Sequence, residues 1–303
     1  MPKRYNTIYG NSETSNIVPN IVSITGGSIS IAGTSTVTGS VSIVIPKDFF
    51  IEVEKNNIPG HSIVKKFGRN TSVATTWSPV CIGGIYQTPT GATTLEFVSS
   101  DVNDCVASTG MHEIVVEGLD ANWVAQTQTM SAHSTSGTTA VSVSGTWTRV
   151  FRSYVSKTGT YATQSAGSHA GTITVREAGG GSTWGTISID TDFPLGQTLI
   201  GAYTIPSNST GYIYLTSITA DSGKTINMAF FKRENANVVT TSYTGVMRIQ
   251  TIFTGISGGT PFNKAGEHFP LGGIPGPADI GFLARGASNP DVAVEFEILL
   301  VAD

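Results

Sequence analysis

Apolar residues alternate with polar residues in short runs along most of this chain, and glycine, asparagine, aspartate or serine bounds each run. Alternation with a period of two predicts strands that have one buried and one wet face. The run at the C-terminal end is the clearest, because its apolar residues share one face and Glu295 and Glu297 stand on the other. Runs of this kind occur at residues 29–43, 49–53, 95–97, 114–116, 141–143, 150–154, 173–175, 187–189, 212–214, 228–230, 247–252 and 292–300.

Many short strands with few helix-forming stretches predict an all-β protein of antiparallel β-sandwiches or jelly rolls. A chain of 303 residues is long enough for two such domains. The periodicity stops in the glycine-rich stretch at 177–182, which indicates a domain boundary or, alternatively, one long surface loop. We therefore predict a β-sandwich domain over residues 47–178 and a second β-sandwich or jelly-roll domain over residues 179–303. An N-terminal arm with short strands over residues 1–46 precedes them.

The first twenty residues show no sustained periodicity. This is expected of an extended arm that becomes ordered only against a partner, and equally of a frayed terminus. No apolar segment of a signal peptide follows the charged residues Lys3 and Arg4, and no later stretch is apolar enough to cross a bilayer. We expect a soluble, unprocessed protein without a membrane partner.

The low charge of the chain argues against nucleic acid as a partner. Only 13% of its residues are charged, the formal net charge is -4 and the sequence pI is about 5.7. Phosphate binding needs clustered lysine and arginine, which this sequence lacks. Cys81 and Cys105 are too few for a disulfide framework and lack the paired spacing of a zinc site, so both are expected to be buried packing residues.

The sequence contains no motif of a known catalytic or metal site. Residues 221–225 end like a phosphate-binding loop, but Ile218 stands where that motif requires its first glycine. No G-x-S-x-G sequence is present either. We predict no catalytic, cofactor-binding or metal-ligating residue. The histidines have no spacing that places two imidazoles on one metal, and they are His61, His112, His133, His169 and His268.

Two close pairs of acidic residues leave an alternative open. Asp101 with Asp104, and Asp190 with Asp192, contain the carboxylates that a calcium site or a glycosidase needs. Turns explain both pairs more economically, because an aspartate side chain accepts hydrogen bonds from nearby backbone amides.

The tryptophans also allow two interpretations. They lie near predicted turns or strand ends, where aromatic rings can stack on sugars, but a sandwich poor in large aliphatic residues needs its aromatics in the core. Core packing is the favoured interpretation for Trp77, Trp123, Trp147 and Trp184.

The stretch Glu117-Gly118-Leu119-Asp120-Ala121-Asn122 matches an E-G-L-D-x-N stretch found in a family of virion structural proteins of tailed bacteriophages. The chain resembles that family over residues 77–303, whereas the residues before this range match nothing comparable. Cys81 and Cys105 depart from the family pattern, which has small or apolar residues there. The resemblance implies a structural component of the virion. It also rests on Trp77-Ser78-Pro79, Gly83-Gly84-Ile85-Tyr86, Arg149-Val150, Ala170-Gly171-Thr172-Ile173 and the final run at 294–301.

Our leading hypothesis is a non-enzymatic, capsid-associated decoration, cement or head protein that stabilises a phage particle through subunit contacts. It would associate with itself, as a homotrimer, and with other virion proteins such as the major capsid protein. The alternative is a tail fibre, nozzle or adaptor component that binds host glycan. A third hypothesis, a polysaccharide-degrading enzyme, requires two acidic residues facing each other across a groove, and the sequence indicates no such pair.

Overall fold

The computed structural model describes residues 48–159, 168–189, 196–221, 223–238, 248–257, 262–265 and 271–303. The predicted N-terminal arm and the strands predicted at 29–43 lie outside these residues and stay predictions. Lys47–Asp303 forms one compact unit. Antiparallel sheets make up most of its described part, which confirms the predicted all-β class.

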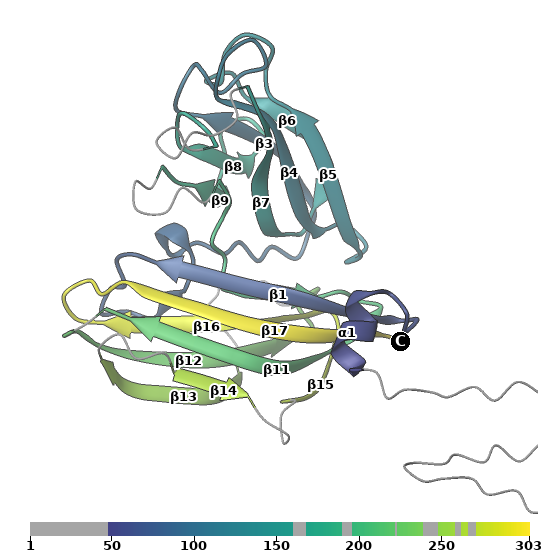
Figure 1. Ribbon diagram of the computed structural model, residues 1–303, viewed down its shortest axis with the longest axis vertical. Helices are drawn as coiled ribbons and strands as arrows, with labels where there is room; N and C mark the ends of the chain where they lie inside the picture. The colour runs from purple at the N-terminus through teal and green to yellow at the C-terminus, as the bar shows by residue number, and fades with distance from the viewer. Residues whose placement is uncertain are drawn as a thin grey trace, which may run out of the picture. The chain divides into compact units, whose positions relative to one another are not determined.

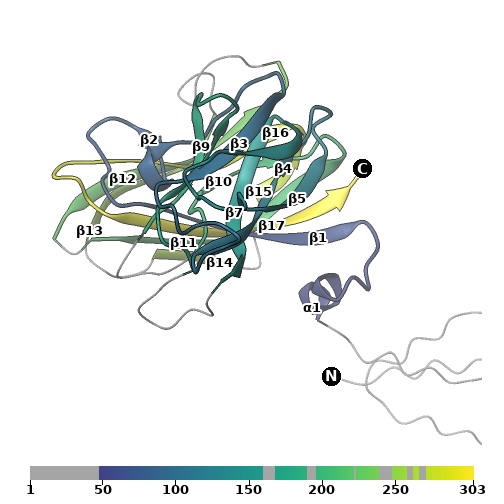
Figure 2. The ribbon, with the colours of Figure 1, turned by 90° about the horizontal axis from the view of Figure 1, so that it is seen from above.

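The larger sandwich contains two sheets with the orders β1-β17-β11-β14 and β10-β16-β12-β13 (Figures 1 and 2). Strand β15 also pairs with β11, and β2 pairs with β16. Buried residues from both sheets, among them Ile213, Phe230, Phe282 and Phe296, form one core. The strands are β1 (His61–Asn70), β2 (Ser78–Pro79), β10 (Ala202–Ile205), β11 (Ser209–Ala220), β12 (Thr225–Glu234), β13 (Arg248–Ser257), β14 (Phe262–Ala265), β15 (Leu271–Pro275), β16 (Ala278–Gly286) and β17 (Val292–Ala302).

The order of these strands is that of a jelly roll. From β1 the chain crosses to β10, returns to β11, crosses to β12 and β13, returns to β14 and β15, crosses to β16 and returns to β17. This alternation between two facing sheets produces the Greek-key connections of the jelly roll. The jelly roll predicted for the C-terminal half is therefore present, and β1 completes it by pairing with β17 from His61 to Asn70.

A second sandwich lies between β2 and β10 in the chain. Its sheets have the orders β6-β3-β8-β9 and β5-β4-β7, and its core includes Leu95, Ile114, Trp147 and Trp184. The glycine-rich stretch at 177–182 is the turn of the β8–β9 hairpin. The strands are β3 (Thr93–Ser99), β4 (Met111–Leu119), β5 (Ala125–Ser131), β6 (Val141–Trp147), β7 (Arg149–Thr158), β8 (Ile173–Glu177) and β9 (Thr183–Ile187).

Strand pairing groups β9 with β3–β8, and β1 with the strands that follow residue 200. Both groupings cross the domain limit predicted after residue 178. Whether independently folding domains end after residues 46 and 178 stays a prediction.

The strand predicted at 49–53 is wrong, because these residues form the helix α1 (Phe49–Glu54) next to β1 (Figure 2). Asp48 begins the helix by accepting a hydrogen bond from the backbone N–H of Ile51 at 3.1 Å. The side chain of Phe50 stacks on Tyr214 of β11, with 4.5 Å between ring centroids. A single turn of 3₁₀ helix, η1 (Ile82–Gly84), follows β2. No helix in the described ranges is both long and apolar enough to cross a membrane.

The prediction for the last strand is confirmed. Along β17 the burial alternates from Val292 onward, with Val294, Phe296 and Ile298 in the core. Glu295 on the opposite face is exposed, and Glu297 is half-buried. The outer face of β17 therefore carries acidic side chains at Glu295 and Glu297.

The E-G-L-D-x-N stretch forms the end of β4 and the turn to β5. The Asp120 carboxylate accepts hydrogen bonds from the backbone N–H groups of Asn122 at 2.8 Å and Val124 at 2.9 Å. Gly118 lies close to β7, where a Cβ atom on it would be 2.0 Å from the carbonyl oxygen of Arg149. The stretch thus has a structural role here, since it shapes a turn and allows two strands to approach closely.

We expect Gly118→Ala to lower the free energy of unfolding by about 1–3 kcal/mol, because the added methyl group displaces the backbone of β7. Urea denaturation measures this difference. Gly91→Ala is the matched control, since no atom lies within 4 Å of a Cβ at Gly91. Equal effects of the two substitutions would contradict the close approach of β4 and β7.

The two sandwiches share part of one core. Phe151 of β7 packs on Tyr203 of β10 with 4.3 Å between ring centroids, and Leu119 and Trp123 belong to the core of the jelly roll. The Lys66 ammonium of β1 donates a hydrogen bond to the carbonyl oxygen of Phe151 at 2.6 Å. The contact between the sandwiches is therefore a packed and hydrogen-bonded interface.

Candidate functional site

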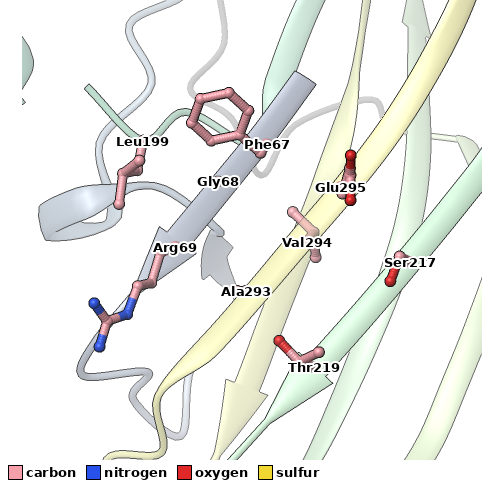
Figure 3. Close-up of a pocket in the computed structure, with 9 residues that line it drawn as sticks. All are labelled: Phe67, Gly68, Arg69, Leu199, Ser217, Thr219, Ala293, Val294 and Glu295. Carbon is pink, nitrogen blue, oxygen red and sulfur yellow. The ribbon is translucent and has the colours of Figure 1, made fainter. Parts of the chain in front are cut away.

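A pocket of about 260 Å³ opens on the outer face of the β1-β17-β11 sheet (Figure 3). Its floor is a grid of two cross-strand rows from these three strands. Strand pairing aligns Phe67, Glu295 and Ser217 in the first row. The second row is Arg69, Ala293 and Thr219. Leu199, from the segment that leads into β10, adds an apolar side chain, and Gly68 and Val294 complete the lining.

The hollow follows from the small side chain in the middle of the second row. Ala293 lies between the longer side chains of Arg69 and Thr219, so the centre of the grid is left open. Arg69 has a fixed position because its Nε donates to both carboxylate oxygens of Asp291, at 3.1 and 2.9 Å. A second guanidinium nitrogen, Nη2, lies 2.5 Å from the same carboxylate. The Arg69 guanidinium is therefore directed to Asp291 at one side of the pocket.

The polar groups of the pocket are available to a ligand. Within the described part of the chain, no side chain or backbone group hydrogen-bonds the Glu295 carboxylate or the hydroxyls of Ser217 and Thr219. These groups offer two hydroxyl donors and several acceptors beside the apolar surface of Phe67 and Leu199. Such an arrangement suits the binding of a small molecule that has both an apolar and a hydroxylated face.

A buried charge network lies at the interface between the sandwiches. Asp279 of β16 accepts hydrogen bonds from Arg149 of β7, with Nε 2.9 Å from Oδ1 and Nη2 3.1 Å from Oδ2. Arg233 of β12 donates to the same Oδ2 through Nε at 3.0 Å and Nη2 at 2.5 Å. Thr204 donates its hydroxyl to Oδ1 at 2.5 Å. The exposed fraction is 0% for Arg149 and Asp279 and 1% for Arg233.

The network keeps Asp279 ionised although it is buried. Burial by itself raises the pKa of a carboxyl group, but the charges of Arg149 and Arg233 and the hydrogen bond from Thr204 outweigh it and lower the pKa of Asp279. Tyr86 extends the network, since its hydroxyl lies 2.8 Å from the Thr204 hydroxyl. The Arg149 guanidinium also lies over the Trp123 ring, 4.7 Å from its centroid. These contacts join the E-G-L-D-x-N turn to the jelly roll.

The structure places the first predicted acid pair in turns. Asp104 is buried, and its carboxylate accepts hydrogen bonds from the Ser99 hydroxyl at 2.5 Å and the backbone N–H groups of Met111 at 2.8 Å, Ala170 at 2.7 Å and Gly171 at 2.8 Å. Asp101 accepts one from the backbone N–H of Asn103 at 2.8 Å. Both carboxylates therefore organise loops, as the turn interpretation predicts.

The pair Asp190 and Asp192 lies outside the described residues, as does His268. Among the residues that the structure describes, no group of three histidine, cysteine or acidic side chains is positioned to hold a metal ion. Lys224 pairs with Asp221 at 3.1 Å and donates to the carbonyl oxygen of Asn289 at 3.2 Å. Lys224 thus lies directly before β12.

The remaining four histidines are separate from one another in their contacts. His61 and His112 each hydrogen-bond a nearby carbonyl oxygen, of Pro59 and Ser108, at 3.0 and 2.7 Å. The backbone N–H of Ser136 lies 3.3 Å from Nδ1 of His133.

His169 is the most buried of these four. Its burial lowers its pKa, against the opposing effects of the Asp104 charge and the Ser188 carbonyl.

Three of the four tryptophans pack in cores, as favoured from the sequence. The exposed fractions of Trp123, Trp147 and Trp184 are 8%, 0% and 1%. Trp77 is half-buried and packs against a third buried cluster that includes Cys81 and Phe231, and the Arg285 guanidinium lies 5.0 Å from its ring centroid. Cys81 and Cys105 are both buried free thiols, which confirms their predicted packing role.

Sequence reasoning missed both the pocket and the charge network. The pocket depends on three strands that are far apart in sequence, although the outward-facing alternation of 292–300 already marked Glu295 as exposed. The partners Arg149 and Asp279 are 130 residues apart, and neither lies in a motif that relates it to the other.

No family model matches the chain, and no curated protein matches it. Among solved structures, the chain is similar to a chain in the structure of infectious bursal disease virus, Gx strain. The identity is 9%, the TM-score is 0.20, and the alignment covers 80% of this chain and 76% of the other. For the Gt strain the identity is 10%, the TM-score 0.18 and the coverage 85% and 81%. For T=1 particles derived from infectious bursal virus, the identity is 11% and the TM-score is 0.17. The alignment covers 84% of this chain and 79% of the other. These TM-scores are too low to show a shared fold.

Proposed function

We propose that this protein is a non-enzymatic structural component of a virus particle, as a capsid-associated decoration, cement or head protein. The observation that carries the proposal is a jelly roll to which a second sandwich is joined by a buried charge network. Jelly rolls recur in viral capsid domains, although the same fold also serves lectins and cupins.

The interface between the sandwiches supports a structural role in a particle. A subunit that bridges neighbours must present its binding surfaces in a fixed relative orientation, because many weak contacts add up only when all of them engage together. Arg149 and Asp279, together with the shared packing of Phe151 and Tyr203, hold the two sandwiches in such an arrangement.

The finer parts of the proposal rest on the sequence. The resemblance of residues 77–303 to virion proteins of tailed bacteriophages favours a phage particle, and the proposed partners are further copies of the chain, as a homotrimer, and the major capsid protein. The alternative is a tail fibre, nozzle or adaptor component that binds host glycan. The pocket on the outer jelly-roll sheet favours this alternative.

Immunogold electron microscopy tests the proposal on purified particles of the virus that encodes this chain. Antibody raised against the folded protein is applied to intact and to detergent-permeabilised particles, with pre-immune serum as the control. Gold over the head supports the capsid-associated role, and gold confined to the tail supports the alternative. Particles without gold in both preparations, while the same antibody detects the protein in the infected-cell lysate, would refute a virion component.

A further inference from the structure

We propose that the pocket on the outer face of the β1-β17-β11 sheet binds a single ring of a neutral saccharide. The inference is independent of where the protein is located on a particle, because it concerns one pocket of the isolated chain. It rests on the size of the grid, on its aromatic side and on the hydroxyl and carboxylate groups that face the hollow.

The dimensions of the grid suit one sugar ring. The two rows are two residues apart along each strand, which corresponds to roughly 7 Å, and three adjacent strands span roughly 10 Å. The volume of about 260 Å³ lies just below the roughly 300–1,000 Å³ of pockets for drug-sized ligands. A ring-sized ligand therefore fills the pocket, whereas a longer chain would continue into solvent.

The apolar side of the pocket suits the less polar face of a sugar ring. Phe67 and Leu199 lie next to each other on one side of the hollow (Figure 3). The face of a phenyl ring carries partial negative charge, so it attracts the weakly positive C–H groups on the flat face of a pyranose. Stacking of this kind orients the sugar ring in the pocket.

The polar side of the pocket suits sugar hydroxyls. Ser217 and Thr219 on β11 can each donate and accept a hydrogen bond, and the exposed Glu295 carboxylate accepts from two adjacent hydroxyls. Because Arg69 is already paired with Asp291, the pocket offers no unpaired cation for an acidic sugar, and Glu295 repels one. The charges of the pocket therefore favour a neutral saccharide over sialic or uronic acids.

The first measurement is ligand-observed NMR of the full chain with methyl glycosides of neutral hexoses and N-acetylhexosamines at about 10 mM, well above a millimolar Kd. Sialic acid and glucuronic acid are measured in parallel. We expect saturation transfer to at least one neutral glycoside and none to the acidic sugars. Failure of every neutral glycoside to bind, or binding of the acidic sugars alone, would overturn the proposal.

Two pairs of variants locate the binding. Ala293→Leu fills the hollow from the outer face of β17, and Val301→Leu on the same face lies outside the pocket. Glu295→Gln removes the acceptor charge, whereas Glu297→Gln changes a carboxylate that does not line the pocket. We expect at least tenfold weaker binding for the first member of each pair and unchanged binding for the second. Circular dichroism checks that each variant is folded, and equal affinities within both pairs would place the sugar elsewhere.

Discussion

Replacing Asp279 with alanine is expected to lower the free energy of unfolding by about 3–5 kcal/mol. The carboxylate balances two guanidinium groups that are almost entirely withdrawn from water. Its removal leaves Arg149 and Arg233 buried beside each other without their common counter-ion. Chemical denaturation followed by tryptophan fluorescence measures the change.

Asp291→Ala is the matched control for this experiment. Asp291 also pairs with an arginine through several contacts, but its side chain is 26% exposed and that of Arg69 is 20% exposed. Partly exposed ion pairs contribute about 1 kcal/mol or less, so this variant should remain close to the wild type. A loss below about 1 kcal/mol for Asp279→Ala, or equal losses for both variants, would contradict a buried network that joins the sandwiches.

Arg149→Met should destabilise the protein less than Asp279→Ala does. Arg149→Met leaves Asp279 paired with Arg233 and hydrogen-bonded by Thr204, so its charge remains balanced. We expect a smaller loss than for Asp279→Ala, because one cation and one anion remain together in the interface.

The strands of this fold were predictable where one face of the sheet is buried. In 292–300 the alternation of apolar and charged residues matches the burial of β17 because the jelly-roll core takes one face and water reaches the other. The same reasoning failed at 49–53, where Phe49, Ile51 and Val53 also alternate. There the N-cap at Asp48 determines the local structure, and Phe49 and Ile51 are exposed on α1 instead of lying in a core.

The connectivity of the jelly roll was only partly predictable. Strand β1 pairs with β17 although the second sandwich, with about a hundred residues, separates β1 from β10 in the chain. No local pattern in 61–70 indicates so distant a partner, because register is set by the burial of whole sheets. The glycines at 179–181 were compatible with a domain boundary or with a surface loop, because a linker and a hairpin turn have the same composition. They form the turn between β8 and β9.

The candidate sites were not predictable from motifs, because neither depends on residues that are close in sequence. The pocket arises where the small Ala293 is surrounded by longer outward side chains of β1 and β11. The network needs Arg149 and Asp279 to meet at the interface of two sandwiches. The sequence singled out only the E-G-L-D-x-N stretch, through its resemblance. The structure places Asp120 of this stretch in a turn, and the neighbouring Trp123 lies under the Arg149 guanidinium.

The stability of the protein is expected to depend on the titration of Lys66. Its side chain is buried, and this desolvation lowers its pKa from 10.5 to about 8, more than the charge of Glu117 raises it. Between pH 8 and 10.5 the unfolded chain therefore binds more protons at this site than the folded chain, and stability increases with pH. The destabilising contribution is fully present below pH 8 and is relieved as the pH approaches 10.5.

Comparison of the wild type with Lys66→Met isolates this contribution, because other titrating groups cancel in the difference. The stability of the wild type relative to the variant should rise by about 3 kcal/mol between pH 8 and 10.5, which is the free energy that corresponds to the lowered pKa. Lys66→Met also loses the hydrogen bond to the Phe151 carbonyl oxygen, which adds a constant term to the difference in unfolding free energy. Urea denaturation at several pH values across this window measures the difference.

Lys65→Met is the control for the Lys66 experiment, since Lys65 is the preceding residue of β1 but its ammonium pairs with Glu54 at 3.1 Å on the surface. The hydrogen bond and charge of Glu54 raise the pKa of Lys65. The stabilising contribution of Lys65 is therefore present between pH 8 and 10.5 and is lost only at higher pH. The free energies of unfolding of the wild type and Lys65→Met should then differ by a nearly constant amount across this range. A constant difference for Lys66→Met as well would mean that Lys66 reaches water, and that the interface between β1 and β7 opens in solution.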